Sequence, residues 1–517
     1  MTHTKRNFTT VMMLIYMVIL LFSVPAVNFV SAQEFSLGQT DKDKIDAYIT
    51  SRMQTSNIPG LALGVIYGDQ IVYLKGYGVA DPTGRTVTPQ TPFILGSTSK
   101  SFTALAIMQL VEAGKIDLDA PVTTYLPWFH TADMSASDPI TVRNLLHQSS
   151  GLPAYVGRQG LSDNDQSNMA LENGVRGLSS VQLTLPAGQG YEYANENYNI
   201  LGLIVQTVSA NSYEDYIRSS IFAPLQMSHS AATLSDPAAI DLATGYRYWF
   251  LSPVPFNAPY PRSMTPSGFL ISSAEDMAQY VSAMLNGGVY GNKQVLSSQG
   301  MATLHTPDSL SSYGMGWVIQ GEPGSTRIWH NGDTSNFHSN ILLLPDQHIG
   351  IVVLVNVNGF FNSAAVNIPI EGVAEILLGN SPDTSTNPPV TIIPQVMLLA
   401  PLLIAIIWIA GSFLSVKRWR DRGELPPSSI RRFWRLYLPL VIDLCSVILV
   451  WIILPTLFHT PVETIALFAP DVFVIVVTLT ALSLGWAMVR TFLTLHSRRQ
   501  DVDTKISSQL KIVRPPI

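Results

Sequence analysis

The chain is short of charge and has almost no cysteine. Only 13% of its 517 residues are charged, and the net charge is −6. No basic run alternates with aromatic residues, so nothing supports nucleic-acid binding. The one cysteine, Cys445, lies in an apolar run. This excludes a disulfide within the chain and argues against a cysteine-based metal site.

Apolar residues make up 47% of the chain, and their excess lies toward its two ends. Lys5 and Arg6 precede an apolar run that extends from Val11 to about Val27. Val30, Ser31 and Ala32 then offer small residues at the positions that a signal peptidase reads. This pattern predicts a secretory signal peptide over residues 1–32. An uncleaved membrane anchor is the alternative, and either one would export the residues after it.

Three further apolar stretches are long enough to span a membrane: residues 396–416, 437–458 and 472–492. The loop between the first two carries seven Lys and Arg residues, the next loop none and the tail five. The positive-inside rule then places the first loop and the tail in the cytoplasm. We expect a linker over 381–395, three transmembrane helices over 396–495, a cytoplasmic tail over 496–517, and residues 33–380 outside.

Residues 33–380 have the composition of a globular domain. Two β-branched runs near its start, 61–67 and 71–77, predict a hairpin around Gly68. Four strand-like segments end the domain: 314–319, 327–330, 339–344 and 349–355. Helical patterns fill the interval, apart from a polar stretch over 154–190 that we expect on the surface. This order predicts one antiparallel sheet formed from both ends of the domain, with a helical region inserted.

Ser97 follows Gly96 at the start of a predicted helix, where its side chain can cap the first turn. Lys100 lies one turn further on and can reach the Ser97 hydroxyl. A partly desolvated lysine can be neutral enough to take the hydroxyl proton, which makes the serine a nucleophile. The pattern alone is weak evidence, because Ser508 and Lys511 repeat it in the tail, where we expect no chemistry.

A serine acylation site also needs a group that protonates the leaving group. Tyr193 is a candidate, because a nearby ammonium would hold its phenol toward phenolate and let it exchange a proton near neutral pH. Asn195 can bond both the lysine head and a substrate amide. Taken alone, a tyrosine at this position is more often structural.

The segment from His330 to Asp333 is the candidate for binding the developing oxyanion. Gly332 would let a ligand approach the backbone closely. The N–H of Asp333, together with that of Ser97, would form the oxyanion hole. His330 would add a donor or a positive charge near a substrate carboxylate, although a lone histidine is usually structural.

Three motifs carry a family resemblance: Gly96-Ser97-Thr98-Ser99-Lys100, Tyr193-Ala194-Asn195 and His330-Asn331-Gly332. They resemble those of the penicillin-recognising serine hydrolases, and most of all the class C β-lactamase-related family of low-molecular-weight penicillin-binding proteins, D-amino-acid peptidases and esterases. The flanking segments 145–153 and 267–277 are also similar to that family, and the resemblance covers about residues 40–380. It departs at His330, Asn331 and Asn336, where relatives often have Lys, Thr and Gly, which weakens a specific β-lactamase assignment.

The resemblance implies an α/β (α+β) sandwich and an acyl-enzyme mechanism. Ser97, Lys100 and Tyr193 would be catalytic, with Asn195, His330, Gly332 and Asp333 binding substrate or the oxyanion. No metal or organic cofactor is implied. We expect a multi-pass protein of the cell membrane whose extracytoplasmic domain hydrolyses small-molecule or peptidoglycan-peptide substrates, D-amino-acid cell-wall peptides first, with β-lactams as further acylating agents. The alternatives are an esterase or weak β-lactamase and, in another class, a sensor of β-lactams or wall fragments.

Overall fold

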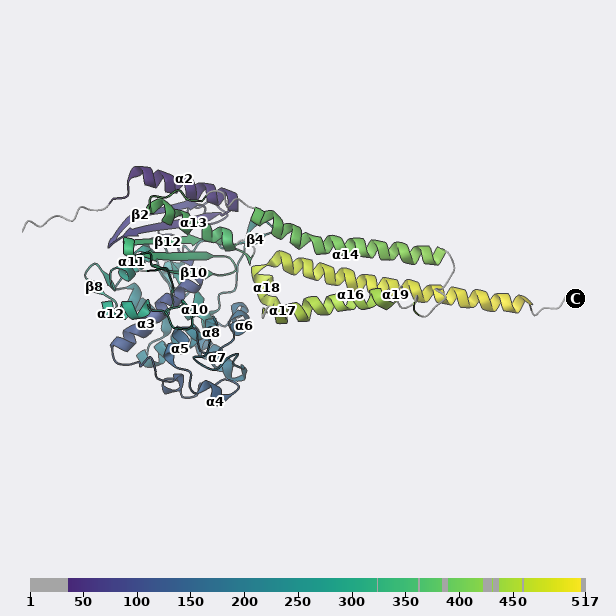
Figure 1. Ribbon diagram of the computed structural model, residues 1–517, viewed down its shortest axis with the longest axis horizontal. Helices are drawn as coiled ribbons and strands as arrows, with labels where there is room; N and C mark the ends of the chain where they lie inside the picture. Colours follow the sequence, from purple (N-terminus) through teal and green to yellow (C-terminus); the bar gives the residue numbers. More distant parts are fainter. Residues whose placement is uncertain are drawn as a thin grey trace, which may run out of the picture. The chain divides into compact units, whose positions relative to one another are not determined.

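The structure is a computed structural model that describes residues 36–322, 324–360, 363–383, 389–421, 430, 437–457 and 460–512. The predicted signal peptide lies outside the described residues, as does most of the loop between the first two predicted spans. Figure 1 shows a sheet flanked by helices, followed by the long C-terminal helices α14 and α19.

Both ends of the globular region contribute to one six-stranded sheet with the order β2-β1-β12-β11-β10-β9. The strands are β1 (Gly60–Tyr67), β2 (Gln70–Gly78), β9 (Val318–Gln320), β10 (Arg327–Asp333), β11 (His338–Leu344) and β12 (Ile349–Val355). Every neighbouring pair is antiparallel, and β1 pairs with β12 along its length. The predicted hairpin and the joining of the two ends in one sheet are therefore confirmed.

The strand expected over 314–319 is shorter than predicted, because β9 begins only at Val318. Gly316 has a φ of +80°, in the left-handed region that interrupts an extended strand. A Cβ on this glycine would stand 2.9 Å from the carbonyl oxygen of Lys100. The sequence before β9 thus forms a turn against helix α3 (Ser99–Glu112) instead of pairing in the sheet.

Two apolar cores cover the two faces of the sheet. Helices α2 (Gln39–Ser56) and α13 (Ser363–Leu377) pack over one face, on alternate residues such as Leu63, Leu342 and Val353 (Figure 1). The other face packs against α11 (Ala274–Leu285) and the helical region through residues such as Ile341 and Leu354. This alternation explains why both faces of β11 and β12 are buried, as in strands covered by helices on each side.

The inserted region is mainly helical. Its longest elements are α3 and α8 (Asn195–Ser209), which contact each other and α10 (Thr265–Gly268). Shorter helices surround them: α4 (Met134–Ser137), α5 (Val142–Leu146), α6 (Ala154–Gln159), α7 (Ala170–Arg176), α9 (Tyr213–Ile217) and α12 (Ser298–Leu304). Short strand pairs complete the region: β3 (Phe93–Ile94) with β6 (Ile271–Ser272), β4 (Tyr246–Trp249) with β5 (Ser252–Pro255) and β13 (Val357–Asn358), and β7 (Val289–Tyr290) with β8 (Lys293–Gln294).

Residues 154–190 are less peripheral than their polar composition predicts. They contain α6 and α7, and Leu171, Val175 and Leu178 are buried in the larger core. These three residues are spaced by four and three positions, so they share one helical face. The surrounding Gly and Ser residues obscure this short apolar stripe in the sequence.

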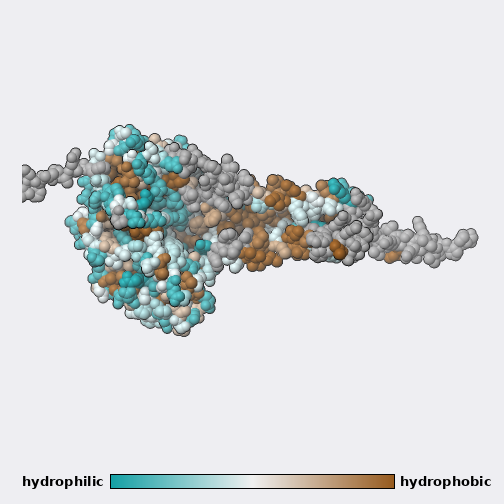
Figure 2. Space-filling view, viewed as in Figure 1, coloured by the Kyte–Doolittle hydropathy of each residue, from teal (hydrophilic) through white to brown (hydrophobic). Residues whose placement is uncertain are grey.

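The C-terminal part contains α14 (Pro389–Asp421), α16 (Leu438–Ile448), α17 (Leu454–Leu457), α18 (Val462–Phe468) and α19 (Pro470–Ile512). Figure 2 shows apolar surface over this part, and its exposed side chains include Ile404, Ile407, Ile452 and Phe492. Within the described residues, two helical segments are long and apolar enough to cross a membrane, Leu399–Arg418 and Pro470–Leu493.

The prediction of three spans is therefore supported for two of them. The middle stretch contains a shorter apolar segment, Leu440–Ile453. It covers most of α16 and a π-helical turn at Leu449–Ile453, and α17 follows directly. Polar contacts link the helices: the Trp408 indole donates to Asp443 at 3.3 Å and the Trp451 indole to Thr480 at 2.6 Å. Such hydrogen bonds between helices are typical of packing in an apolar surrounding.

Candidate active site

Ser97 lies in a single 3₁₀ turn, Gly96–Thr98, immediately before α3. The predicted cap is wrong, because the Ser97 side chain does not cap that helix. Gly96 has a φ of +56°, and a Cβ there would stand 2.4 Å from the amide nitrogen of Asp333. The backbone before the serine is therefore shaped by strand β10 rather than by helix α3.

Lys100 projects from the first turn of α3 into a fully buried position. Its Nζ lies 2.9 Å from Ser97 Oγ, 2.8 Å from Asn195 Oδ1 and 2.6 Å from the carbonyl oxygen of Ser267. The structure thus brings three of the predicted site residues together around one nitrogen. Ser267 was recognised only as part of a flanking motif, and a backbone acceptor has no signature in the sequence.

Burial lowers the pKa of Lys100 well below its ordinary value, and the nearby Glu196 raises it in part. Glu196 is itself buried beside the site, and burial raises the pKa of its carboxyl group. Its side chain accepts a hydrogen bond from Asn199 at 2.9 Å. Both shifts favour the uncharged forms, so a neutral amine at Lys100 is the form this environment selects.

Tyr193 is the third predicted catalytic residue, and it lies close enough to Ser97 for the serine side chain to affect the pKa of its phenol. The Lys100 Nζ sits over the Tyr193 ring, 4.8 Å from its centroid. Burial raises the pKa of the Tyr193 phenol, and the neighbouring Ser97 side chain only partly opposes this. Burial thus shifts the pKa values of both groups toward their uncharged forms, which is the opposite of the expected phenolate beside an ammonium.

His330 is buried at the centre of strand β10 and lies beside Tyr193, with ring centroids 6.3 Å apart. Its Nδ1 lies 2.6 Å from the carbonyl oxygen of Asn331, and its Nε2 lies 3.1 Å from the Tyr313 hydroxyl. Burial is the main cause that lowers the pKa of His330 to about 4. The sequence suggests that His330 is either a hydrogen-bond donor or a positive charge near the substrate. A neutral ring can only be a hydrogen-bonding group.

Gly332 and Asp333 bring the end of β10 against the serine turn. A Cβ on Gly332 would stand 1.9 Å from the carbonyl oxygen of Leu95 and 2.8 Å from the amide nitrogen of Ser97. Only a glycine fits at this distance. The backbone amides of Ser97 and Asp333 thus belong to adjoining segments, as an oxyanion hole formed by both would require.

The side chain of Asp333 has a structural environment of its own. Its carboxylate accepts hydrogen bonds from His338 Nδ1 at 2.8 Å, Asn358 at 2.8 Å and Asn331 at 2.9 Å. Neighbouring His338 and these donors lower its pKa against the opposing effect of burial. The carboxylate holds the turn between β10 and β11 in place, and only the Asp333 backbone faces the serine turn.

Tyr313 is a site residue that the sequence did not reveal. It is buried and packs edge-on against the rings of both Tyr193 and His330, with centroids 5.9 and 5.8 Å away. It lies in an irregular Ser-rich and Gly-rich stretch that resembles no motif. Its hydroxyl contact with His330 fixes which side of that ring faces Tyr193.

A comparison with family profiles matches residues 45–373 to the family described as Beta-lactamase. The chain belongs to the Beta-lactamase family. This match covers more than half of the chain and includes every candidate site residue named above. The fold is accordingly that of the β-lactamase and penicillin-binding-protein group of serine hydrolases.

Individual relatives of this Beta-lactamase family member agree with the match. The chain is 28% identical over 429 residues to Protein flp of Staphylococcus aureus strain N315, covering 81% of this chain and 82% of that protein. It is similar to a penicillin-binding protein homologue from Pyrococcus abyssi, with a TM-score of 0.58, 28% identity and coverage of 66% and 79%. FmtA from Staphylococcus aureus gives a TM-score of 0.54, 25% identity and coverage of 66% and 88%.

Proposed function

We propose that this protein is a membrane-anchored, extracytoplasmic serine hydrolase that forms an acyl-enzyme on Ser97 with amide or ester substrates. The observation that carries the proposal is the fully buried Lys100, whose Nζ lies 2.9 Å from the Ser97 hydroxyl oxygen. A buried amine without a close carboxylate partner is a base at neutral pH, and a base beside a serine is what nucleophilic catalysis requires.

A neutral amine at Lys100 can make all three contacts if Ser97 is the donor in one of them. Two N–H groups donate to Asn195 Oδ1 and the Ser267 carbonyl oxygen, which leaves the nitrogen lone pair for the Ser97 hydroxyl proton. In the first step Ser97 Oγ bonds to the substrate carbonyl carbon, and its proton passes to Lys100. The carbonyl oxygen becomes negative, and the backbone N–H groups of Ser97 and Asp333 donate to it.

Tyr193 then acts as the proton carrier to the leaving group. Its phenol donates a proton to the departing nitrogen or oxygen as the bond to the carbonyl carbon breaks, and it recovers a proton from the protonated Lys100. Water next attacks the acyl carbon and loses a proton to the same pair of groups, and Ser97 Oγ leaves with a proton restored. His330 and Asn195 orient the substrate.

D-amino-acid peptides of the cell wall are the first substrate class in this proposal. The relatives support a wall-related role by name, since one of the similar structures is a penicillin-binding protein homologue. Two apolar helices of spanning length support a membrane anchor, which would hold the domain near an insoluble substrate. The positive-inside distribution and the predicted signal peptide support an extracytoplasmic position for residues 33–380.

Covalent labelling of the full chain with a fluorescent penicillin and a fluorophosphonate tests the proposal. Labelling should be lost in Ser97→Ala and kept in Ser508→Ala, which removes the serine of the repeated Ser-x-x-Lys pattern in the tail. Labelling of Ser97→Ala at the rate of the unsubstituted protein would remove Ser97 from this role.

Relative rates then separate the alternatives. Hydrolysis of D-Ala-D-Ala peptides faster than nitrophenyl esters and a chromogenic cephalosporin supports a peptidase, and the reverse orders support an esterase or a weak β-lactamase. A labelled Ser97 with no turnover of any of the three substrates would favour the sensor.

A further inference from the structure

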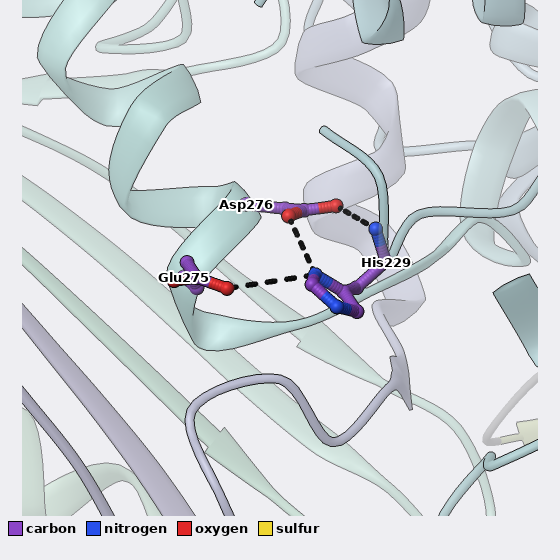
Figure 3. Close-up of side chains that lie close together, drawn as sticks. All are labelled: His229, Glu275 and Asp276. Atoms are coloured by element: carbon purple, nitrogen blue, oxygen red, sulfur yellow. Dashed lines mark hydrogen bonds and ion pairs between the residues drawn. The ribbon is translucent and has the colours of Figure 1, made fainter. Parts of the chain in front are cut away.

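A second cluster of reactive side chains lies at the start of helix α11. His229 comes from the loop before the Ala231–Ile271 bridge, and Glu275 and Asp276 come from the first turn of the helix. Figure 3 shows the imidazole Nδ1 turned toward both carboxylates. One atom from each of the three side chains can be chosen so that all three lie within 4.8 Å of one another. None of the three takes part in the reaction proposed for Ser97.

The distances from the imidazole to the two carboxylates are long for ion pairs and also fit ligands of a shared metal ion. Nδ1 of His229 lies 3.4 Å from Asp276 Oδ1 and 3.5 Å from Glu275 Oε2. A hydrogen bond between a charged imidazole and a carboxylate is shorter, about 2.7–2.9 Å. Ligand atoms bound tetrahedrally to zinc at about 2.0–2.2 Å are about 3.3–3.6 Å apart. The two separations from His229 Nδ1 fall in this range, and the two carboxylate oxygens lie within 4.8 Å of each other.

The buried Asp276 carboxylate is oriented as a ligand would be. Its side chain is fully buried, and Oδ2 accepts from the His229 backbone N–H at 2.7 Å (Figure 3). The same oxygen also accepts from the Ser230 hydroxyl at 2.7 Å. Oδ1 has no partner outside the cluster among the described residues. In the described part of the chain, the one contact of Oδ1 is the long one to His229 Nδ1, at 3.4 Å, and fixed hydrogen bonds to the other oxygen are typical of ligating carboxylates.

We propose that His229 Nδ1, Glu275 Oε2 and Asp276 Oδ1 bind one Zn²⁺. The imidazole nitrogen favours zinc over calcium and magnesium, which take oxygen ligands. The fourth position faces the exposed side of His229, where water completes the coordination. Three protein ligands and one water match zinc's preference for four neighbours.

The bound ion would connect the loop to the segment that leads to the nucleophile. Ser230 hydrogen-bonds Ser272 at 2.7 Å, and strand β6, which contains Ser272, pairs with β3 directly before the serine turn. A ligand that binds only the folded chain raises its stability in proportion to the logarithm of its concentration. Zinc therefore has a stabilising role here, distinct from the chemistry of Ser97.

The competing explanation is an ion pair between His229 and the two carboxylates, without a metal ion. The dipole of α11 favours carboxylates at this end of the helix whether or not zinc is bound. Calorimetric titration of the full chain with ZnCl₂ distinguishes the two. The protein is purified in detergent without a histidine tag and freed of metal with EDTA, which is then removed. We expect one equivalent of zinc to bind and the midpoint of thermal unfolding to rise by several degrees.

Substitution of the two partly exposed ligands completes the test. His229→Ala and Glu275→Gln should each weaken zinc binding at least tenfold, while their thermal midpoints without zinc show that they fold. His130→Ala and Glu322→Gln, which change the same residue types outside the cluster, should bind zinc as the unsubstituted protein does. Binding of less than half an equivalent, equal binding by the His229 and Glu275 variants, or equally tight binding of CaCl₂ would each overturn the proposal.

Discussion

Replacing Lys100 with glutamine separates its proposed role as a base from its role as a hydrogen-bond donor. The buried Nζ donates to Asn195 at 2.8 Å and to the Ser267 carbonyl at 2.6 Å. A glutamine amide can still donate to one or both acceptors, but it has no basic lone pair for the Ser97 proton. Lys100→Gln should therefore fold and fail to acylate.

The expected magnitudes follow from these contacts. Loss of a positioned general base typically lowers a rate by about 10²–10⁴, which corresponds to about 2.7–5.4 kcal/mol in the activation free energy. If the shorter side chain leaves one buried acceptor unpaired, the free energy of unfolding falls by about 1–3 kcal/mol. The loss in the rate of Ser97 acylation should thus be larger than the loss that a small fraction of unfolded Lys100→Gln protein could cause.

The assay is the rate constant for covalent labelling of Ser97 by fluorescent penicillin, measured as a function of pH. In the unsubstituted protein this rate should fall as pH falls through the depressed pKa of Lys100, because the protonated amine has no lone pair. Lys100→Gln should lose that dependence. Lys511→Gln, in the repeated pattern of the tail, is the control and should label normally.

Stability gives an independent reading of the same pKa. Because Lys100 is neutral when folded and protonated when unfolded, stability should rise with pH between its depressed folded pKa and its ordinary value of 10.5. The variant should lack this contribution to the thermal midpoint. A Lys100→Gln protein that labels within threefold of the normal rate would refute the assignment of Lys100 as the base.

Three further results are expected. Tyr193→Phe should fold and lose about 10²–10⁴ in turnover of a peptide substrate, because the leaving group lacks its proton donor. Tyr191→Phe, at a more exposed position, is the control and should retain turnover. Equal turnover rates for the two variants would contradict the role of Tyr193. Gly332→Ala should lower both labelling and the thermal midpoint, since its Cβ would overlap a carbonyl oxygen at 1.9 Å, whereas Gly38→Ala, with nothing within 4 Å, should change neither. Because the folded pKa of His330 is about 4 rather than 6.5, acidification from pH 6.5 to 4 should lower the free energy of unfolding by about 3 kcal/mol. In His330→Asn the thermal midpoint should depend less on pH over this range.

The architecture of the sheet could be predicted because its strands have local signatures. The runs 61–67 and 349–355 are apolar and β-branched, and turn residues bound them. The structure places them side by side in antiparallel register, from Leu61 opposite Val355 to Tyr67 opposite Ile349. The three candidate motifs could be found for a related reason, since each is a short string of residue types tied to one kind of chemistry.

Other features depend on contacts that no local pattern encodes. The turn that holds Ser97 follows from the close approach of β10 to Gly96, and the protonated state of Tyr193 follows from burial. Tyr313 comes from an irregular loop and Ser267 contributes only a carbonyl oxygen. The span prediction counted apolar residues, and it could not show that a π-helical turn at Leu449–Ile453 interrupts the regular helix of the middle segment.

The sheet unites the first and last strands of the domain, and this sets the order in which the nascent chain can mature. The hairpin of β1 and β2 leaves the ribosome early, but the partner of β1 is β12, which is made only at Ile349–Val355. Until then one edge of β1 offers unpaired backbone groups that other chains could join. Pairing between such distant segments is slow, so the cell must shield this edge through most of translation. Closure can follow only shortly before the apolar helix that begins at Pro389 is synthesised.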